Sequence, residues 1–212
     1  MSNKKLAVFG ATGKVGSHFV RQALEAGYTL RVLVRNAAKF GYSDRANVDV
    51  IVGDATDLGD VEKTMASADV VVSCLGNPKN VLIMEKAYDN IMTAAAKQAQ
   101  PPRCIMISSI GLGGSSWLIK LMLTLIAGKA SVDDGEQADK RVREDSKAPF
   151  VLVRPYALTD KAGIGNYTLI KGKDGTFARP ISREDVALFM LRCVEDDQWD
   201  KRAVMLGGTR VA

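Results

Sequence analysis

The sequence predicts a doubly wound α/β fold, in which a parallel sheet carries helices on both faces. Short apolar segments rich in β-branched residues alternate with helical patterns along nearly the whole chain, an order of elements that builds a parallel sheet. Most of these segments run without polar alternation, as strands do when both faces of a sheet are covered. The 212 residues, 47% hydrophobic and 25% charged, fit one domain spanning residues 1–212.

The first half of the chain is expected to contain four strands and three helices. Each strand is an apolar run that ends at a turn residue, and each helix repeats apolar residues every three or four positions. The expected strands are residues 6–9, 30–34, 48–52 and 70–73, and the expected helices are 14–26, 57–66 and 79–98. Gly27 follows the first helix, Asp57 or Thr56 caps the second, and Pro101 follows the third.

The second half continues the alternation but contains two irregular segments. Strands are expected at residues 104–108, 150–154 and 203–206, and helices at 115–126, 133–146 and 182–194. Ser182 and Asp185 fit a capping box at the start of the last helix. A hairpin is expected around residues 167–177. We expect the segments 109–131 and 155–181 to form a small, substrate-side C-terminal lobe over the carboxyl edge of the sheet, where ligands bind in such folds.

A glycine-rich turn follows the first strand, with the sequence Gly10-Ala11-Thr12-Gly13-Lys14-Val15-Gly16. The first glycine permits a tight turn, the second lets backbone N–H groups approach a pyrophosphate, and the third lets the helix pack close to the sheet. A plain tight turn is the alternative interpretation. The position between a strand and a helix favours dinucleotide binding by Gly10, Thr12, Gly13, Lys14, Val15 and Gly16.

Arg35 ends the second strand, about 20 residues beyond the turn, where NAD-binding chains carry an acidic residue for the ribose 2′-hydroxyl. No acidic residue lies between Glu25 and Asp44. A guanidinium at this place can pair with a 2′-phosphate, with Lys14 and Lys39 adding charge. We therefore expect NADP(H) to be preferred over NAD(H); an arginine simply exposed to solvent is the alternative.

The ends of the third and fourth strands extend the expected cofactor site. Asp54 can accept a hydrogen bond from an adenine amino group, although it could also serve as a turn or cap residue. The backbone after the fourth strand lies where a cofactor ribose is bound in such folds. The expected cofactor-binding residues here are Asp54, Ala55, Cys74, Leu75 and Gly76.

Charge, cysteine and histidine content exclude several other classes. The 29 basic and 24 acidic residues give a net charge of +5 without a block of like charges, so no nucleic-acid partner is expected. Three cysteines without metal-ligand spacing indicate free thiols in a reducing compartment, and we expect a cytoplasmic location. His18, the single histidine, lies on a helix surface and offers no metal cluster, so no metal is expected. No transmembrane segment is expected.

Together the segments GATGKVG (10–16), VLVRN (32–36), GDATD (53–57), VVSCLG (71–76), ISSIG (107–111) and VLVRPYALTD (151–160) resemble the atypical, NmrA-like branch of the short-chain dehydrogenase/reductase superfamily. In its compactness the chain is similar to the biliverdin reductase B/flavin reductase type. The resemblance implies a Rossmann-like fold with NADPH along the carboxyl edge of the sheet. It places Ser108 and Pro155 beside the cofactor.

The resemblance also implies two catalytic candidates. Ser109 matches the family's active-site serine position, with a turn serine as the alternative. Tyr156 could donate a proton or stack near the nicotinamide, with a packed aromatic residue as the alternative. Arg154 is interpreted as structural.

The chain departs from many short-chain reductases because it lacks their Tyr-x-x-x-Lys pair. Residues 128–147 contain no tyrosine, and Val132 and Glu136 occupy the expected places. Tyr167 and Lys171 match the spacing literally but fall in a predicted strand, so we interpret them as coincidence. A conjugated acceptor can be reduced without the pair if solvent supplies the proton.

The sequence thus predicts an NADPH-dependent reductase that passes hydride to a flavin, bilin, quinone or reactive carbonyl. The alternatives are a non-catalytic NADP(H)-binding redox-sensing regulator and an assembly factor that uses the same fold. The apolar stretch 115–127 is the reason for considering an assembly factor. We interpret this stretch as a buried helix; a substrate-facing lid and a membrane-touching surface are the alternatives. We expect a small-molecule partner and a monomer or small homo-oligomer.

Overall fold

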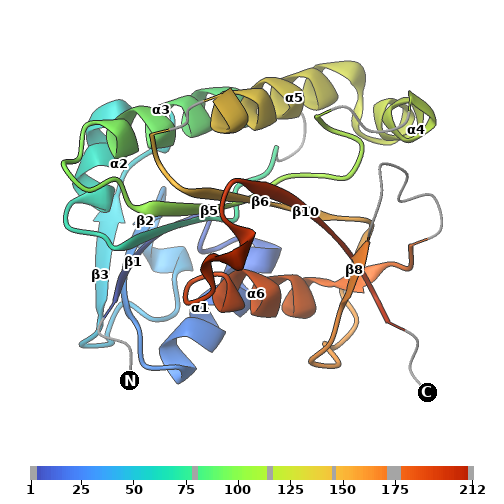
Figure 1. Ribbon diagram of the computed structural model, residues 1–212. Helices are drawn as coiled ribbons and strands as arrows, with labels where there is room; N and C mark the ends of the chain where they lie inside the picture. Colours follow the sequence, from blue (N-terminus) through green and yellow to red (C-terminus); the bar gives the residue numbers. More distant parts are fainter. Residues whose placement is uncertain (1–3, 78–80, 114–116, 145–146, 171–177, 210–212) are drawn as a thin grey trace.

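The computed structural model describes residues 4–77, 81–113, 117–144, 147–170 and 178–209. Eight strands form the central sheet in the order β3-β2-β1-β4-β5-β6-β10-β8 (Figure 1). All pair in parallel except β8, which is antiparallel to β10. Their bounds are Lys5–Phe9 (β1), Thr29–Val34 (β2), Val48–Val52 (β3), Val70–Ser73 (β4), Arg103–Ile107 (β5), Phe150–Pro155 (β6), Thr168–Ile170 (β8) and Arg202–Gly207 (β10). The predicted Rossmann-like α/β fold is confirmed.

Helices cover both faces of this sheet. On one face lie α1 (Lys14–Glu25) and α6 (Arg183–Arg192), and on the other lie α2 (Leu58–Met65), α3 (Met84–Ala96) and α5 (Lys129–Glu144) (Figure 1). Two short strands, β7 (Leu158–Thr159) and β9 (Ile181–Ser182), pair separately, and two 3-10 turns, η1 (Ala37–Lys39) and η2 (Asp197–Trp199), connect elements. One helix, α4 (Trp117–Ala127), lies beyond the end of α5.

Strands β1 to β6 supply both hydrophobic cores, because successive side chains point to opposite faces. In β1, Leu6 and Val8 pack in the core beneath α1 and α6, whereas Ala7 and Phe9 pack in the core beneath α2, α3 and α5. All four are fully buried. This is the physical reason for the unbroken apolar run Leu6–Phe9 in β1.

Side-chain caps begin two of the helices, α2 and α6. Asp57 Oδ1 accepts a hydrogen bond from Asp60 N at 2.9 Å, and Ser182 Oγ accepts one from Asp185 N at 2.9 Å, so both predicted caps are present. Helix α3 begins later than predicted, at Met84, where Asp134 of α5 accepts its backbone N–H at 3.0 Å. Residues 78–80, part of the predicted helix, lie outside the described residues.

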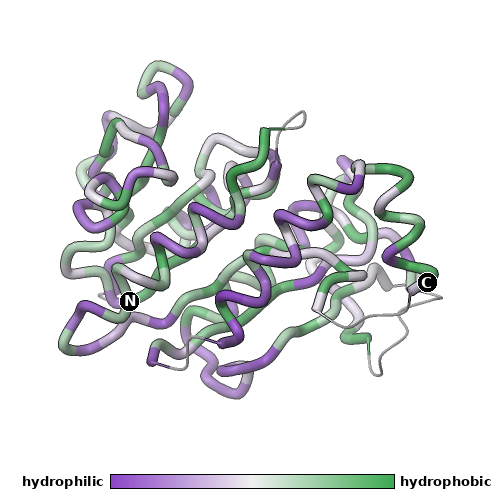
Figure 2. The backbone as a smooth tube through the Cα atoms, turned by 90° about the horizontal axis from the view of Figure 1, so that it is seen from above, coloured by the Kyte–Doolittle hydropathy of each residue, from purple (hydrophilic) through white to green (hydrophobic). Residues whose placement is uncertain are grey.

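In the second half, Thr168–Ile170 is a strand that pairs antiparallel with β10; residues 171–177, the rest of the predicted hairpin, lie outside the described residues. The expectation of a buried helix in the segment 115–127 was wrong. Helix α4 is not buried, since Ile119 is its one buried residue. Figure 2 shows it as a mainly hydrophobic segment at one end of the molecule. Helix α5 begins at Lys129, before the predicted start at 133, directly after Gly128 at a φ of +81°.

Candidate functional site

The glycine-rich turn brings β1, α1 and β4 into close contact. Gly10 has a φ of +74°, and a Cβ there would lie 2.8 Å from the carbonyl carbon of Cys74. A Cβ on Gly16 would lie 2.0 Å from the carbonyl oxygen of Gly10. Gly13 N donates to the same carbonyl at 3.0 Å, and Gly13 caps α1 without a side-chain bond. The helix N-terminus therefore keeps N–H donors of the kind that bind phosphates.

A groove of about 270 Å³ opens where the sheet order reverses, at the carboxyl ends of β1 to β4. We call it the switch-point groove, the place where doubly wound sheets bind nucleotides. Nine residues from the sequence prediction line it together: Gly10, Thr12, Gly13, Arg35, Asp54, Ala55, Cys74, Leu75 and Gly76.

Three predicted residues of the turn do not line the groove. The Lys14 Nζ pairs with Asp160 Oδ2, directly after β7, at 2.8 Å. Val15 is buried in the core beneath α1, and Gly16 packs on Gly10. The structure therefore does not bring the Lys14 charge to the groove, and Val15 and Gly16 act by shaping the backbone.

Two charged side chains line the groove, Arg35 and Asp54. Arg35 is exposed at the end of β2. Asp54 Oδ1 accepts hydrogen bonds from Thr56 N at 2.8 Å and Thr56 Oγ1 at 2.7 Å. These bonds lower the pKa of Asp54, and the charge of Arg35 lowers it further. Asp54 consequently stays an acceptor, the form that an amino group requires.

A second hollow, the carboxyl-edge pocket, has a volume of about 440 Å³ and adjoins the groove, since Leu75 and Gly76 line both. The predicted residues Ser108, Ser109, Pro155 and Tyr156 meet here. Both irregular segments also contribute, 109–131 through Leu112, Leu123 and Ala127, and 155–181 through Leu158.

A buried ionic network holds Ser108, one of the residues that line this pocket. The Asp139 carboxylate, whose side chain is fully buried, accepts two hydrogen bonds from Arg154 Nη2 at 2.7 Å and one from Ser108 Oγ at 2.8 Å. Arg143 Nε donates to it at 2.8 Å. Gly113, at a φ of +67°, covers the pair, and a Cβ there would lie 2.2 Å from Arg154 Nη2.

The network supports the structural interpretation of Arg154. Sequence reasoning missed Asp139, although an aspartate four residues before an arginine in a helix is a visible ion-pair signal.

The two catalytic candidates differ in their contacts. Ser109 Oγ donates to the Ile110 carbonyl at 3.1 Å, as a turn serine does. The backbone N–H of Tyr156 donates a hydrogen bond to the Leu206 carbonyl at 2.8 Å. The Tyr156 side chain is half-buried, and it is the one tyrosine among the described residues that line the pocket.

The positions of the usual tyrosine–lysine pair carry other contacts. Val132 is buried and lines the pocket, and Glu136 pairs with Lys120. Tyr167 packs edge-on against Phe189, with ring centroids 5.1 Å apart, and accepts a hydrogen bond from Arg192, whereas Lys171 lies outside the described residues. Neither Tyr167 nor the α5 positions supply a proton donor to the pocket.

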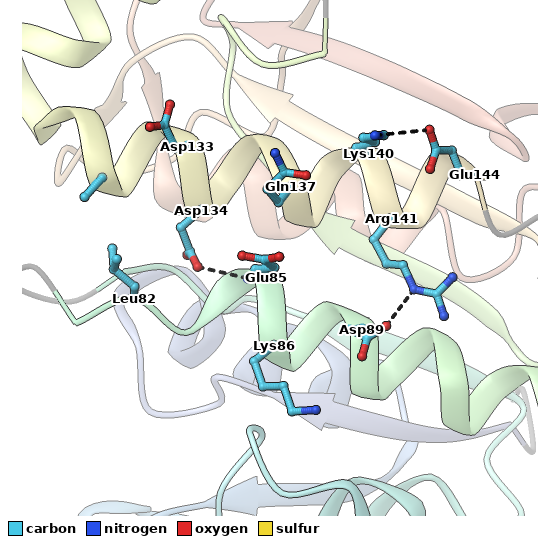
Figure 3. Close-up of a pocket in the computed structure, with 11 residues that line it drawn as sticks. Leu82, Glu85, Lys86, Asp89, Asp133, Asp134, Gln137, Lys140, Arg141 and Glu144 are labelled. Carbon is cyan, nitrogen blue, oxygen red and sulfur yellow. Dashed lines mark hydrogen bonds and ion pairs between the residues drawn. The ribbon is translucent and has the colours of Figure 1, made fainter.

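A larger hollow of about 670 Å³ lies between α3 and α5, away from the strand ends (Figure 3). Its lining is charged, and four of the charges pair within it: Arg141 Nε with Asp89 Oδ1 at 2.7 Å and Lys140 Nζ with Glu144 Oε1 at 3.9 Å. None of the predicted site residues lines this hollow, so it is not part of the candidate site.

One of the three cysteines, Cys74, lies in the groove. The three cysteines are free, and burial raises the pKa of the Cys74 thiol in the groove to about 12, which keeps it protonated. Within the described ranges no cluster of side chains could hold a metal ion. None of the helices in this part of the chain is long and apolar enough to span a bilayer.

A family model described as NAD(P)H-binding matches residues 10–197. Curated relatives include the divinyl chlorophyllide a 8-vinyl-reductase of Arabidopsis thaliana, 25% identical over 95% of this chain and 52% of the relative. Protein TIC 62 of Pisum sativum is 26% identical over 86% of this chain and 39% of the relative. The chain spans about half the length, or less, of these relatives.

Solved structures share the fold over almost the whole chain. The anaerobilin reductase ChuY of Escherichia coli O157:H7 superposes with a TM-score of 0.81 at 21% identity, covering 98% of each chain. A short-chain dehydrogenase/reductase of Veillonella parvula, solved with NADP, gives a TM-score of 0.82 at 20% identity, covering 97% of this chain and 95% of that one. At such identities the likeness shows the fold.

Proposed function

The chain belongs to the NAD(P)H-binding family, and from this premise we propose that it is an NADPH-dependent reductase of the atypical short-chain type. It passes hydride directly to a flavin, bilin, quinone or reactive carbonyl. The observation that carries the proposal is the junction of the two hollows: a dinucleotide held in the switch-point groove would place its far end at Leu75 and Gly76, where the carboxyl-edge pocket begins.

The groove supplies a partner for each part of the cofactor. Backbone N–H groups at the start of α1 would hold the pyrophosphate, Arg35 would pair with the 2′-phosphate, and Asp54 would accept from the adenine amino group. When bound, the cofactor supplies a hydride to the acceptor. The absence of an acidic residue at the end of β2 supports NADP over NAD.

The pocket would orient the acceptor. Its apolar wall, which includes Leu75, Met84 and Leu112, suits a flat conjugated ring. The Asp139 network holds the end of β5 in place, and Tyr156 or water would deliver the proton that accompanies the hydride. Two relatives are named as reductases of anaerobilin and of divinyl chlorophyllide, which favours a tetrapyrrole among the acceptors.

The wider setting is also part of the proposal. The segments 109–131 and 155–181 form the substrate-side lobe of a single domain, and both contribute to the pocket lining. Three free thiols support a reducing compartment, with the cytoplasm as the proposed location.

The test is NADPH oxidation against FMN, riboflavin, biliverdin, a quinone and a dicarbonyl, with NADH in parallel and binding of both cofactors measured by calorimetry. We expect turnover with at least one acceptor, faster with NADPH. Tight NADPH binding without turnover on any acceptor would contradict the reductase and favour the redox-sensing regulator. The missing tyrosine–lysine pair makes that outcome the main competitor.

A further inference from the structure

Arg183 is the one charged residue among the described residues that line the carboxyl-edge pocket. Its side chain is 19% exposed, and the rest of the described lining is apolar or uncharged. Arg183 is also the first residue of α6, the end of a helix at which the helix dipole disfavours a cation. The position of this charge therefore needs a reason other than the stability of α6.

The short strands β7 and β9 place Arg183 beside Asp160. The two strands pair in parallel with Thr159 opposite Ser182, and Asp160 and Arg183 are the next residues along the chain. Arg183 Nη1 donates to Asp160 Oδ1 at 2.5 Å, and Lys14 Nζ donates to Asp160 Oδ2 at 2.8 Å. Two positive charges thus share one carboxylate, and the cluster is one negative charge short of neutrality.

The other carboxylates near the pocket have partners of their own. Asp139 belongs to the buried ionic network, and Asp134 accepts hydrogen bonds from backbone N–H groups at the start of α3. In the first turn of α6, Glu184 and Asp185 accept backbone N–H groups of the loop 163–165. Asp160 is therefore the carboxylate that pairs with this guanidinium in the described part of the chain.

The bond between Arg183 and Asp160 is one that an incoming anion can replace. The Asp160 side chain is 63% exposed, and an ion pair with an exposed partner contributes little to stability. If an anionic group of a ligand takes its place, Asp160 keeps its pair with Lys14 and every charge of the cluster has a partner. The bond to Asp160 uses Nη1, whereas a guanidinium can bind a carboxylate or a phosphate through two parallel N–H groups.

We propose that Arg183 is a specificity-determining residue, which selects acceptors that carry an anionic substituent, a carboxylate or a phosphate, over their neutral analogues. The inference rests on the proposed function: the apolar lining receives the ring that accepts the hydride, and Arg183 receives the anionic group. Asp160 competes for the same guanidinium and so weakens the binding of every such acceptor. The two residues therefore have opposite effects on acceptor binding, although they form one ion pair.

The experiment is calorimetric titration of the complete chain, with NADP⁺ present, with two pairs of probes: FMN with riboflavin, and biliverdin with its dimethyl ester. The members of a pair share their ring system and differ in a phosphate or in carboxylates, so the two pairs separate the two anions. We expect the anionic member of at least one pair to bind about tenfold more tightly. Arg183→Gln should abolish this preference, Arg183→Lys should keep part of it, and Asp160→Asn should increase it.

The matched control is Arg31→Gln. The Arg31 side chain is 18% exposed and pairs with Asp49 on β3, so the change removes an equal charge from a similar environment. It should leave the preference unchanged, which separates a local effect from that of the net charge. Circular dichroism on each variant checks that the fold is intact.

Equal binding of the anionic and neutral members by the native chain, or no binding of any probe, would overturn the role of Arg183. So would a preference that Arg183→Gln keeps, or one that Asp160→Asn lowers as far as Arg183→Gln does, because breaking the ion pair would then be the whole effect. A preference for the anionic member without turnover would overturn the proposed function alone, and turnover with equal affinities within both pairs would overturn the role of Arg183 alone.

Discussion

At the residue scale, Gly16 has the least room for change. A Cβ on Gly16 would lie 2.0 Å from the carbonyl oxygen and 2.8 Å from the carbonyl carbon of Gly10, and both of these are backbone atoms. Gly16→Ala should therefore lower the free energy of unfolding by about 1–3 kcal/mol and weaken NADPH binding. Urea unfolding and calorimetry measure the two effects. Gly41→Ala, where the Cβ meets nothing within 4 Å, is the control; equal stability of the two variants would refute the close-packing interpretation.

Arg35 determines the proposed choice between NADPH and NADH. Replacing it with aspartate removes a charge-assisted contact to the 2′-phosphate, which contributes roughly 1.5–3 kcal/mol. Calorimetry should show NADPH affinity falling by at least tenfold in Arg35→Asp while NADH affinity is kept. Arg202→Asp, an equal charge change at the start of β10, should alter neither. Parallel losses for both cofactors in Arg35→Asp would remove the assignment.

At the element scale, Asp139 joins α5 to β6 and to the end of β5. Asp139→Asn should leave the buried Arg154 poorly compensated and cost about 3–5 kcal/mol of unfolding free energy, measured by urea unfolding. Asp133→Asn, on the same helix, removes an exposed pair with Lys129 and should cost under about 1 kcal/mol. A similar small cost for both would show that the network contributes little.

Glu184 links the first and last helices and makes part of the stability depend on pH. The Gly163 N–H, bonded at 2.8 Å, lowers the pKa of this carboxyl, and Arg21 on α1 lowers it further. A carboxyl whose pKa is lowered by folding stabilises the folded state at pH values above its ordinary pKa. This stabilisation is lost as the pH falls through the lowered pKa. Glu184→Gln should thus be less stable than the native chain at neutral pH, by under about 1 kcal/mol.

The measurement is urea unfolding of both chains across the acidic range. The difference between them should close as the pH falls below the lowered pKa of Glu184. A difference that stays constant with pH would contradict the role of the charge.

At the scale of the whole molecule, the sequence predicted those features of the fold that depend on residues close together in the chain. The continuous apolar strands, the glycine turn and the caps at Asp57 and Ser182 depend on near neighbours, and the structure has them. It could not reveal contacts between distant segments: Asp139 with Arg154, Lys14 with Asp160, or β8 with β10.

The exposure of α4 was missed for the same reason. An apolar helix with little charge has the sequence of a buried element, and whether another element covers it is decided by the rest of the fold. In this molecule α4 lies beyond the end of α5, so its outer face stays uncovered.

The central claim is direct hydride transfer from NADPH at the junction of the two hollows. The most direct measurement compares the oxidation rates of ordinary NADPH and NADPH deuterated at the transferred C4 position, with each acceptor of the panel. Our account predicts slower oxidation of the deuterated cofactor with at least one acceptor, and carbon-bound deuterium in the product when that acceptor is biliverdin. Tight NADPH binding with no oxidation above the protein-free rate would contradict it.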